Sequence, residues 1–126
     1  MTQPNRREWT RVSVVVDVEV GPEGHPKISG QARDVSIKGL YLVTPKTLPP
    51  GTVCRLNLLL SGTQAPVYVR VSGRVVYVDG SGMALEFFQV DAESFVHLRN
   101  LVLYNSADPD QVEREFQAHL GLKRHP

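Results

Sequence analysis

The chain has 126 residues, and its hydrophobic content of 41% and charged content of 21% are typical of a single soluble globular domain rather than a disordered one. The formal net charge of +1 argues against a general nucleic-acid binder with a broad basic face, and no apolar run approaches the roughly 18 residues of a membrane span. The single cysteine, Cys54, excludes an intrachain disulfide and a cysteine-based zinc site, so we expect a cytoplasmic protein.

The chain opens with a basic segment. RREWTR, residues 6–11, places three arginines in six positions, although the chain as a whole is nearly neutral. The segment is polar, and its arginines repel one another electrostatically. We therefore expect residues 1–11 to form a mobile arm before the first strand. Such an arm fits a solubilising tail, a nucleic-acid arm or one wall of an anion site.

The segment 12–90 has the pattern of a β domain. VSVVVDVEV alternates, with Val12, Val14, Val16, Val18 and Val20 on one face, which predicts a half-buried strand. Turn sequences rich in glycine and proline separate this strand from five further candidate strands at 27–34, 39–44, 53–60, 67–78 and 83–88. Short strands at this spacing favour a six-stranded antiparallel β-barrel, because closure removes exposed strand edges.

The segment 91–126 is predicted to be a helical extension. Asp91 is a candidate N-cap for a helix over 91–105, and Asp108 with Pro109 begins a second helix that ends at Gly121. Both helices carry an apolar stripe, so we expect them to pack against the domain.

A second unusual segment is DVSIKGLYL, residues 34–42. In an extended chain Asp34 and Ser36 would point to the same side, about 7 Å apart. Gly39 permits a bulge or a positive φ and lets a flat ligand approach the backbone closely. The segment therefore predicts a surface with a carboxylate, a hydroxyl and a bare backbone patch.

The two segments together suit a ligand that contains both guanine and phosphate. Arg7 and Arg11 offer planar charged groups for phosphate or for the O6/N7 edge of guanine. Asp34 offers an acceptor to the N1–H and N2–H donors of guanine. The residues alone are compatible with a guanine nucleotide, and they do not exclude other anionic ligands.

The motif R-x-x-x-R at Arg7 and Arg11, followed by D-x-S-x-x-G at Asp34, Ser36 and Gly39, resembles the PilZ family of cyclic di-GMP receptors. The first motif precedes a strand, and GMALEF at 82–87 is similar to the closing barrel strand of that family. The resemblance covers residues 6–88. Either motif alone would be weak, but their order in an all-β domain of this size is specific.

The resemblance implies roles for the motif residues. Arg7 and Arg11 would hold the phosphates and the guanine Hoogsteen edges, Asp34 and Ser36 would hydrogen-bond the ligand, and Gly39 would maintain the strand shape. A basic residue at the position of Arg6 implies an intercalated dimer of cyclic di-GMP rather than one molecule.

We also expect a further ligand contact from the strand at 73–78. Arg74 and Tyr77 are the candidates, and the choice between them depends on the position of a bulge.

The leading hypothesis is a non-enzymatic cyclic di-GMP receptor whose ordered arm signals to an unidentified downstream protein. The alternatives are a PilZ-like protein-interaction module that does not bind nucleotide, and a nucleic-acid binder that uses the basic arm. No nucleophile motif supports an enzyme. The four histidines are scattered along the chain, so we expect no metal site and no cofactor other than the ligand.

Overall fold

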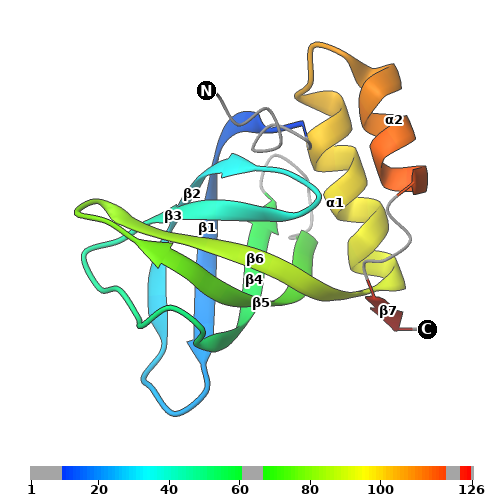
Figure 1. The fold of residues 1–126 in the computed structure, drawn as a ribbon. Helices are drawn as coiled ribbons and strands as arrows, with labels where there is room; N and C mark the ends of the chain where they lie inside the picture. The colour runs from blue at the N-terminus through cyan, green and yellow to red at the C-terminus, as the bar shows by residue number, and fades with distance from the viewer. Residues whose placement is uncertain (1–9, 61–66, 119–122, 126) are drawn as a thin grey trace, which may run out of the picture.

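The fold was analysed in a computed structural model, which describes residues 10–60, 67–118 and 123–125. Six strands and two helices follow one another along the chain, and a short strand follows the second helix (Figure 1). The elements are β1 (Val12–Pro22), β2 (Ile28–Val35), β3 (Gly39–Val43), β4 (Val53–Leu60), β5 (Val67–Val78), β6 (Gly82–Asp91), α1 (Ala92–Tyr104), α2 (Pro109–Ala118) and β7 (Lys123–His125).

The first six strands form a closed antiparallel barrel, as the sequence predicts. The strand order is β3-β2-β1-β4-β5-β6, and an additional pairing of β3 with β6 closes the ring. In β1, Val12, Val16, Val18 and Val20 are buried and Val14 packs half-buried against the core, which confirms the predicted valine face. The alternating strands thus supply a barrel interior filled by aliphatic side chains.

The C-terminal segment contains one element that the sequence pattern did not predict. β7 pairs in parallel with residues 89–91 of β6, beyond Glu86, where the pairing of β6 with β3 stops. Residues 91–126 are therefore not purely helical. Three residues carry too little pattern to indicate a strand, and this strand depends on an edge of β6 that only the barrel exposes.

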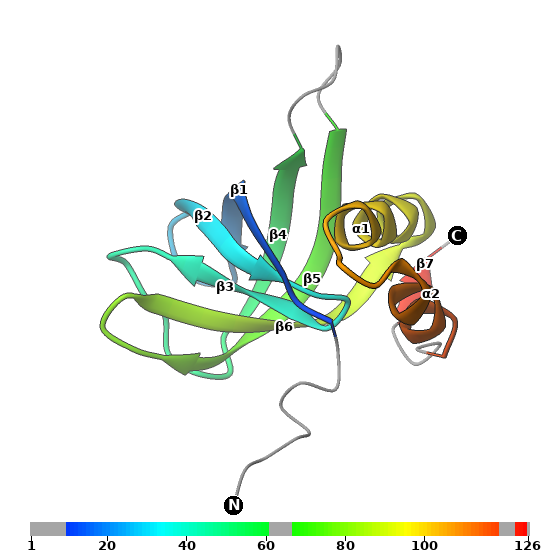
Figure 2. The ribbon, with the colours of Figure 1, turned by 90° about the horizontal axis from the view of Figure 1, so that it is seen from above.

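α1 lies against one flank of the barrel, and α2 lies beside α1 (Figure 2). Asp91 caps α1 by accepting a hydrogen bond from the backbone of Ser94 at 2.7 Å. The buried hydroxyl of Ser94 in turn accepts a hydrogen bond from the backbone N–H of Arg70 on β5, at 2.9 Å. This bond attaches the first turn of α1 to the barrel.

The second helix packs mainly on α1. Phe116 of α2 meets Phe95 of α1 edge to face, with 5.4 Å between the ring centroids, and Arg99 forms an ion pair with Glu113. Asp108 accepts a hydrogen bond from the backbone of Gln111, which confirms the predicted cap. No helix in the described ranges is long and apolar enough to cross a membrane.

Candidate functional site

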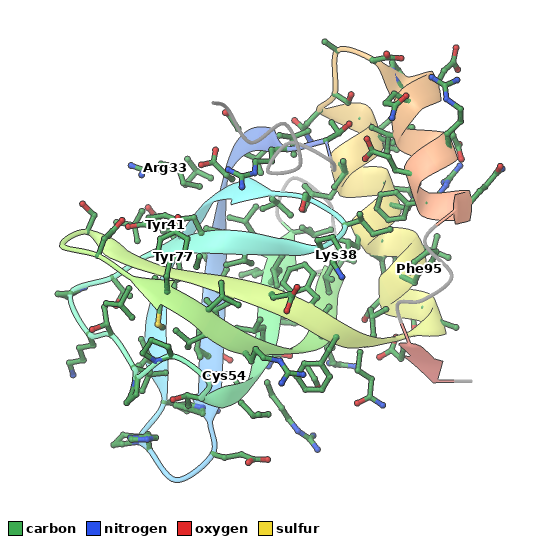
Figure 3. The ribbon with its side chains drawn as sticks, in the orientation of Figure 1. Arg33, Lys38, Tyr41, Cys54, Tyr77 and Phe95 are labelled. Carbon is green, nitrogen blue, oxygen red and sulfur yellow. The ribbon has the colours of Figure 1, made fainter. Side chains whose placement is uncertain are left out.

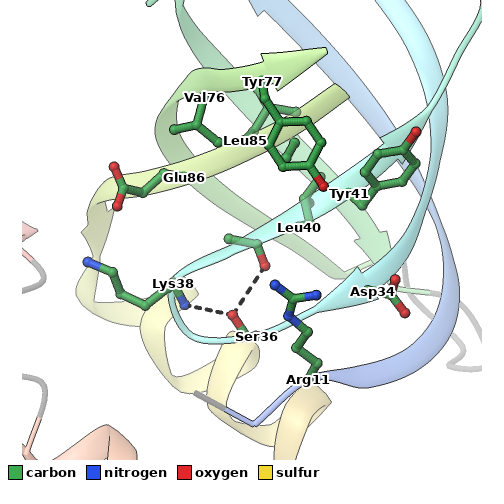
Figure 4. Close-up of a pocket in the computed structure, with 12 residues that line it drawn as sticks. Arg11, Asp34, Ser36, Lys38, Leu40, Tyr41, Val76, Tyr77, Leu85 and Glu86 are labelled. Carbon is green, nitrogen blue, oxygen red and sulfur yellow. Dashed lines mark hydrogen bonds between the residues drawn. The ribbon is translucent and has the colours of Figure 1, made fainter. Parts of the chain in front are cut away.

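The candidate site is a hollow on the outer surface of the barrel. One row of paired residues crosses five strands there: Ser13, Asp34, Tyr41, Ala84 and Tyr77. Since the small side chain of Ala84 stands between two tyrosines, the row is recessed at Ala84. The hollow has a volume of about 220 Å³ (Figure 4).

Polar and aromatic groups surround the hollow and aliphatic groups form its floor. The lining residues are Arg11, Asp34, Ser36, Lys38, Gly39, Leu40, Tyr41, Val76, Tyr77, Ala84, Leu85 and Glu86. The site therefore joins the chain segment just before β1 to β2, β3, β5 and β6, which are distant in sequence.

Two irregularities in the strand ladders turn additional side chains towards this surface. In β2 the pairing with β3 shifts between Ala32 and Asp34, so that Arg33 and Asp34 are both turned away from the core. In β5 the pairing with β6 shifts between Val75 and Tyr77, and Val76 is the extra residue. A β-bulge places two consecutive side chains on one face, and here it brings Val76 and Tyr77 outward together.

Of the two predicted contacts from β5, the structure brings one to the hollow. Tyr77, 53% exposed, lines the hollow. The guanidinium of Arg74 instead lies over the ring of Phe88, 4.7 Å from its centroid, and does not line the hollow. The structure thus supports Tyr77 as a candidate ligand contact and places Arg74 in a cation–π contact.

A tight turn between β2 and β3 forms the lower wall (Figure 4). The backbone N–H of Ser36 donates to the carbonyl of Gly39 at 2.9 Å, and the Ser36 hydroxyl accepts from the backbone of Lys38 at 3.0 Å. The sequence spacing predicted that Asp34 and Ser36 point to the same side of one extended strand. This prediction does not hold for Ser36, because β2 ends at Val35 and Ser36 lies in the turn. Its hydroxyl holds the turn that presents Lys38 to the hollow.

A glycine is needed at position 39 because two strands of the barrel approach closely there, and not because the backbone has a positive φ. Its φ is not positive, in contrast to that of Gly24 and Gly51, and no register shift occurs at Gly39. A Cβ atom at this position would lie 2.1 Å from the carbonyl oxygen of Leu85 on β6. The glycine thus allows the backbones of β3 and β6 to approach where the barrel closes.

The charges around the hollow are mixed in sign. Arg11 extends into it between Ser36 and Asp34 (Figure 4), and Lys38 and Glu86 lie on the opposite side. Within the described residues Arg11 and Asp34 form no ion pair with each other. A cationic group and a carboxylate are both available to a ligand, which suits a molecule with phosphates and with N–H donors better than a simple polyanion.

Tyr41 is held in place by two neighbours. Its hydroxyl donates a hydrogen bond to Asp79 in the β5–β6 turn, and the guanidinium of Arg33 lies 5.3 Å from its ring centroid (Figure 3). The bond to Asp79 is the main reason that the pKa of Tyr41 is raised and the pKa of Asp79 is lowered. Asp79 also accepts from the backbones of Ser81 and Gly82, so the tyrosine is fixed to an ordered turn.

The structure brings four of the six predicted binding residues together: Arg11, Asp34, Ser36 and Gly39. Arg6 and Arg7 lie outside the described residues. Sequence reasoning missed the other lining residues, which are Lys38, Leu40, Tyr41, Val76, Ala84, Leu85 and Glu86. Lys38 and Tyr41 stand within and just after the D-x-S-x-x-G segment, which is the signal that could have found them.

The described residues offer no reactive thiol and no metal-binding cluster beside the hollow. Cys54 is buried in β4, and burial raises the pKa of its thiol, which keeps it protonated and unreactive. Among the described residues no group of three or more histidine, cysteine, aspartate or glutamate side chains could hold a metal ion.

The structure is thus a small closed antiparallel β-barrel domain with a mixed-charge hollow beside Arg11. The sequence model of the PilZ domain matches residues 5–104, and the chain belongs to this family. A comparison with curated proteins finds no match.

Several solved structures are similar to the chain, among them the following three. The inhibitor of motility MotI/DgrA from Bacillus subtilis has 19% identity and a TM-score of 0.64 over 94% of this chain, which spans 54% of the length of MotI. The PilZ domain of CeSA from a cellulose-synthesizing bacterium has 18% identity and a TM-score of 0.58, with 74% and 94% of the two chains covered. The PilZ domain of YcgR from Escherichia coli, solved with c-di-GMP, has 11% identity and a TM-score of 0.61, with 91% and 99% covered. These likenesses show a shared fold.

Proposed function

We propose that the protein is a non-enzymatic receptor for cyclic di-GMP. The observation that carries the proposal is the assembly of Arg11, Asp34, Ser36 and Gly39 around one hollow. These residues belong to two motifs that are 22 residues apart, and the barrel brings them to one surface. Membership of the PilZ family and the nucleotide in the YcgR structure support the choice of ligand.

Each group of the hollow has a partner on this ligand. Arg11 provides a planar cation that can bond a phosphate or the Hoogsteen edge of a guanine. Asp34 provides an acceptor for the guanine N1–H and N2–H. Tyr41 and Tyr77 provide aromatic faces beside a recess floored by Ala84, where a base can stack.

The arm supplies the remaining charge in this proposal. Arg7 stands four residues before Arg11, and two phosphates would offset the repulsion between the two arginines. Ordering each residue costs about 1–2 kcal/mol, and charge-assisted hydrogen bonds of about 1.5–3 kcal/mol each offset that cost. The closed arm would then be the surface that a downstream protein recognises. Arg6, next to the first motif arginine, is proposed to favour two intercalated ligand molecules.

A calorimetric titration with cyclic di-GMP tests the proposal. We expect binding with about two ligands per protein, and Arg11→Ala should weaken it by at least about tenfold, because it removes charge-assisted bonds. Asp34→Asn should also weaken it, since an amide replaces one carboxylate oxygen with a donor. Arg7→Ala tests whether the arm contributes to binding of cyclic di-GMP.

Arg114→Ala is the matched control, because it removes the same charge from an exposed position on α2. A ratio of one ligand per protein would contradict the intercalated dimer and leave the receptor intact. Wild-type protein that binds no cyclic di-GMP would contradict the receptor and favour a protein-interaction module.

A further inference from the structure

The root of the N-terminal arm is bonded to the C-terminal helix α2. The backbone N–H of Thr10 donates to Oε1 of Glu115 at 2.8 Å, and the Thr10 hydroxyl donates to Oε2 at 2.7 Å. The two residues are 105 positions apart in sequence, so this contact joins nearly opposite ends of the chain. Both carboxylate oxygens are used by a single residue of the arm.

Glu115 is an unusual place for a carboxylate. The residue is 6% exposed, and a buried carboxylate is costly unless its oxygens are bonded. Its third donor is the side-chain amide of Gln111, at 3.2 Å. Within the described part of the chain no cation pairs with it. Thr10 therefore supplies two of the three hydrogen bonds that keep this carboxylate buried.

The same contact fixes the position of Arg11. Arg11 stands between Thr10, which is bonded to α2, and Val12, which is 3% exposed and pairs with Val35 in the barrel. The backbone on both sides of Arg11 is thus attached, and its side chain extends into the hollow (Figure 4). Without the contact to α2, the attached part of the chain would begin only at Val12.

We propose that Glu115 is a positioning residue of the ligand site: α2 holds Thr10 so that the backbone of Arg11 has a fixed position beside the hollow. This inference rests on the proposed function. Pre-organisation lowers the ordering cost of binding, so the Thr10–Glu115 contact raises affinity without touching the ligand. Coupling is reciprocal, so the ligand in turn stabilises the docking of α2.

This coupling gives the helical extension a part in the function. α2 packs mainly on α1 and has little direct attachment to the barrel, so its docking is the element that the arm can strengthen or weaken. A ligand that binds Arg11 thereby acts on a helix pair on the flank of the molecule (Figure 2).

Variants of the contact test the proposal in calorimetric titrations with cyclic di-GMP. Thr10→Val, which removes the hydroxyl donor, and Glu115→Gln, which removes the charge and one acceptor, should each weaken binding about tenfold. The affinity of the double variant should fall by about the same factor as that of each single variant, because both substitutions act on the same contact. Thr10→Ser keeps the hydroxyl and should bind within about twofold of wild type.

Glu113→Gln is the matched control. It removes a carboxylate from the same helix, but Glu113 is half-exposed and pairs with Arg99, away from the arm. Its affinity should equal that of wild type. If Glu115→Gln does not fold, Thr10→Val carries the test, since Thr10 precedes the first strand.

Hydrogen exchange of α2 amides gives the reciprocal readout. Cyclic di-GMP should slow exchange over residues 112–117 in wild type and in Thr10→Ser, and should have a much smaller effect in Thr10→Val. Wild-type affinity in Thr10→Val and Glu115→Gln, or multiplication of their losses in the double variant, would overturn the positioning role alone. Absence of binding by the wild type would overturn the proposed function as well.

Discussion

The barrel has two sides with different strand pairing. On the regular side, β4 pairs with β5 over eight consecutive positions and with β1 over six, with no shift in register. On the pocket side, the β1–β2, β2–β3 and β5–β6 ladders each contain at least one shift. The strands of these three ladders supply most of the residues that line the hollow.

This difference separates stability from binding. A regular ladder alternates its side chains strictly, so one face fills the core and the other faces solvent. A bulge directs two neighbouring side chains outward and concentrates functional groups on one surface. We therefore expect substitutions on the regular side to change mainly stability, and outward substitutions on the pocket side to change mainly binding.

The largest effect should come from Gly39→Ala, which breaks the separation. A Cβ atom at this position would lie 2.1 Å from the backbone oxygen of Leu85, so β3 must move away from β6. We expect a loss of about 3 kcal/mol or more in the free energy of unfolding by urea denaturation, together with weaker binding of cyclic di-GMP. Gly80→Ala is the control, since a Cβ there meets no atom within 4 Å. Equal stability of the two variants would contradict the close approach of β3 and β6.

Leu58→Ala should show a pure stability effect on the regular side. Leu58 is fully buried in β4, and a cavity of this kind costs about 3 kcal/mol. Its affinity for cyclic di-GMP, measured at a temperature where the variant is folded, should match that of wild type. Leu59→Ala is the comparison, because Leu59 is half-buried and should cost less. A large loss of affinity in Leu58→Ala would show that the two sides are coupled.

Tyr77→Ala and Tyr68→Ala compare two exposed tyrosines of one strand. Tyr77 follows the bulge and lines the hollow, whereas Tyr68 lies in the regular ladder with β4. If Tyr77 stacks on a base, its loss should weaken binding roughly tenfold, and the loss of Tyr68 should not change it. Titration calorimetry on both variants measures this. Equal affinities would remove Tyr77 from the site.

The smallest effect should be electrostatic. Tyr41→Phe removes the hydrogen bond that lowers the pKa of Asp79, so the pKa of Asp79 should rise towards its ordinary value in an NMR titration. In the wild type this bond stabilises the fold above the ordinary carboxyl pKa of about 4, and the stabilisation is lost as the pH falls through the lowered pKa of Asp79. Tyr68→Phe should leave that pKa unchanged. An unchanged pKa in Tyr41→Phe would contradict the hydrogen bond.

Local pattern was sufficient for much of the fold. The alternating valines of β1 and the glycine- and proline-rich turns predicted the strands, and Asp91 and Asp108 marked the starts of the helices. These signals succeed because strand alternation and helix capping depend on residues within a few positions of one another. The position of β7 could not be predicted in this way, because a three-residue strand is specified by its partner edge on β6.

For the site, the sequence by itself determined which residue types are present and in what order: arginines before the first strand, then Asp34, Ser36 and Gly39. The tertiary structure decided which of the described residues meet. The register of the ladders sets Tyr41 and Tyr77 on either side of Ala84, because one extra residue in β5 turns Tyr77 outward, and Arg74 contacts Phe88 instead of the hollow. The bond between Thr10 and Glu115 joins residues 105 positions apart, and no local pattern carries information over that distance. Contacts of this kind exist only once the barrel has closed and the helices have docked on it.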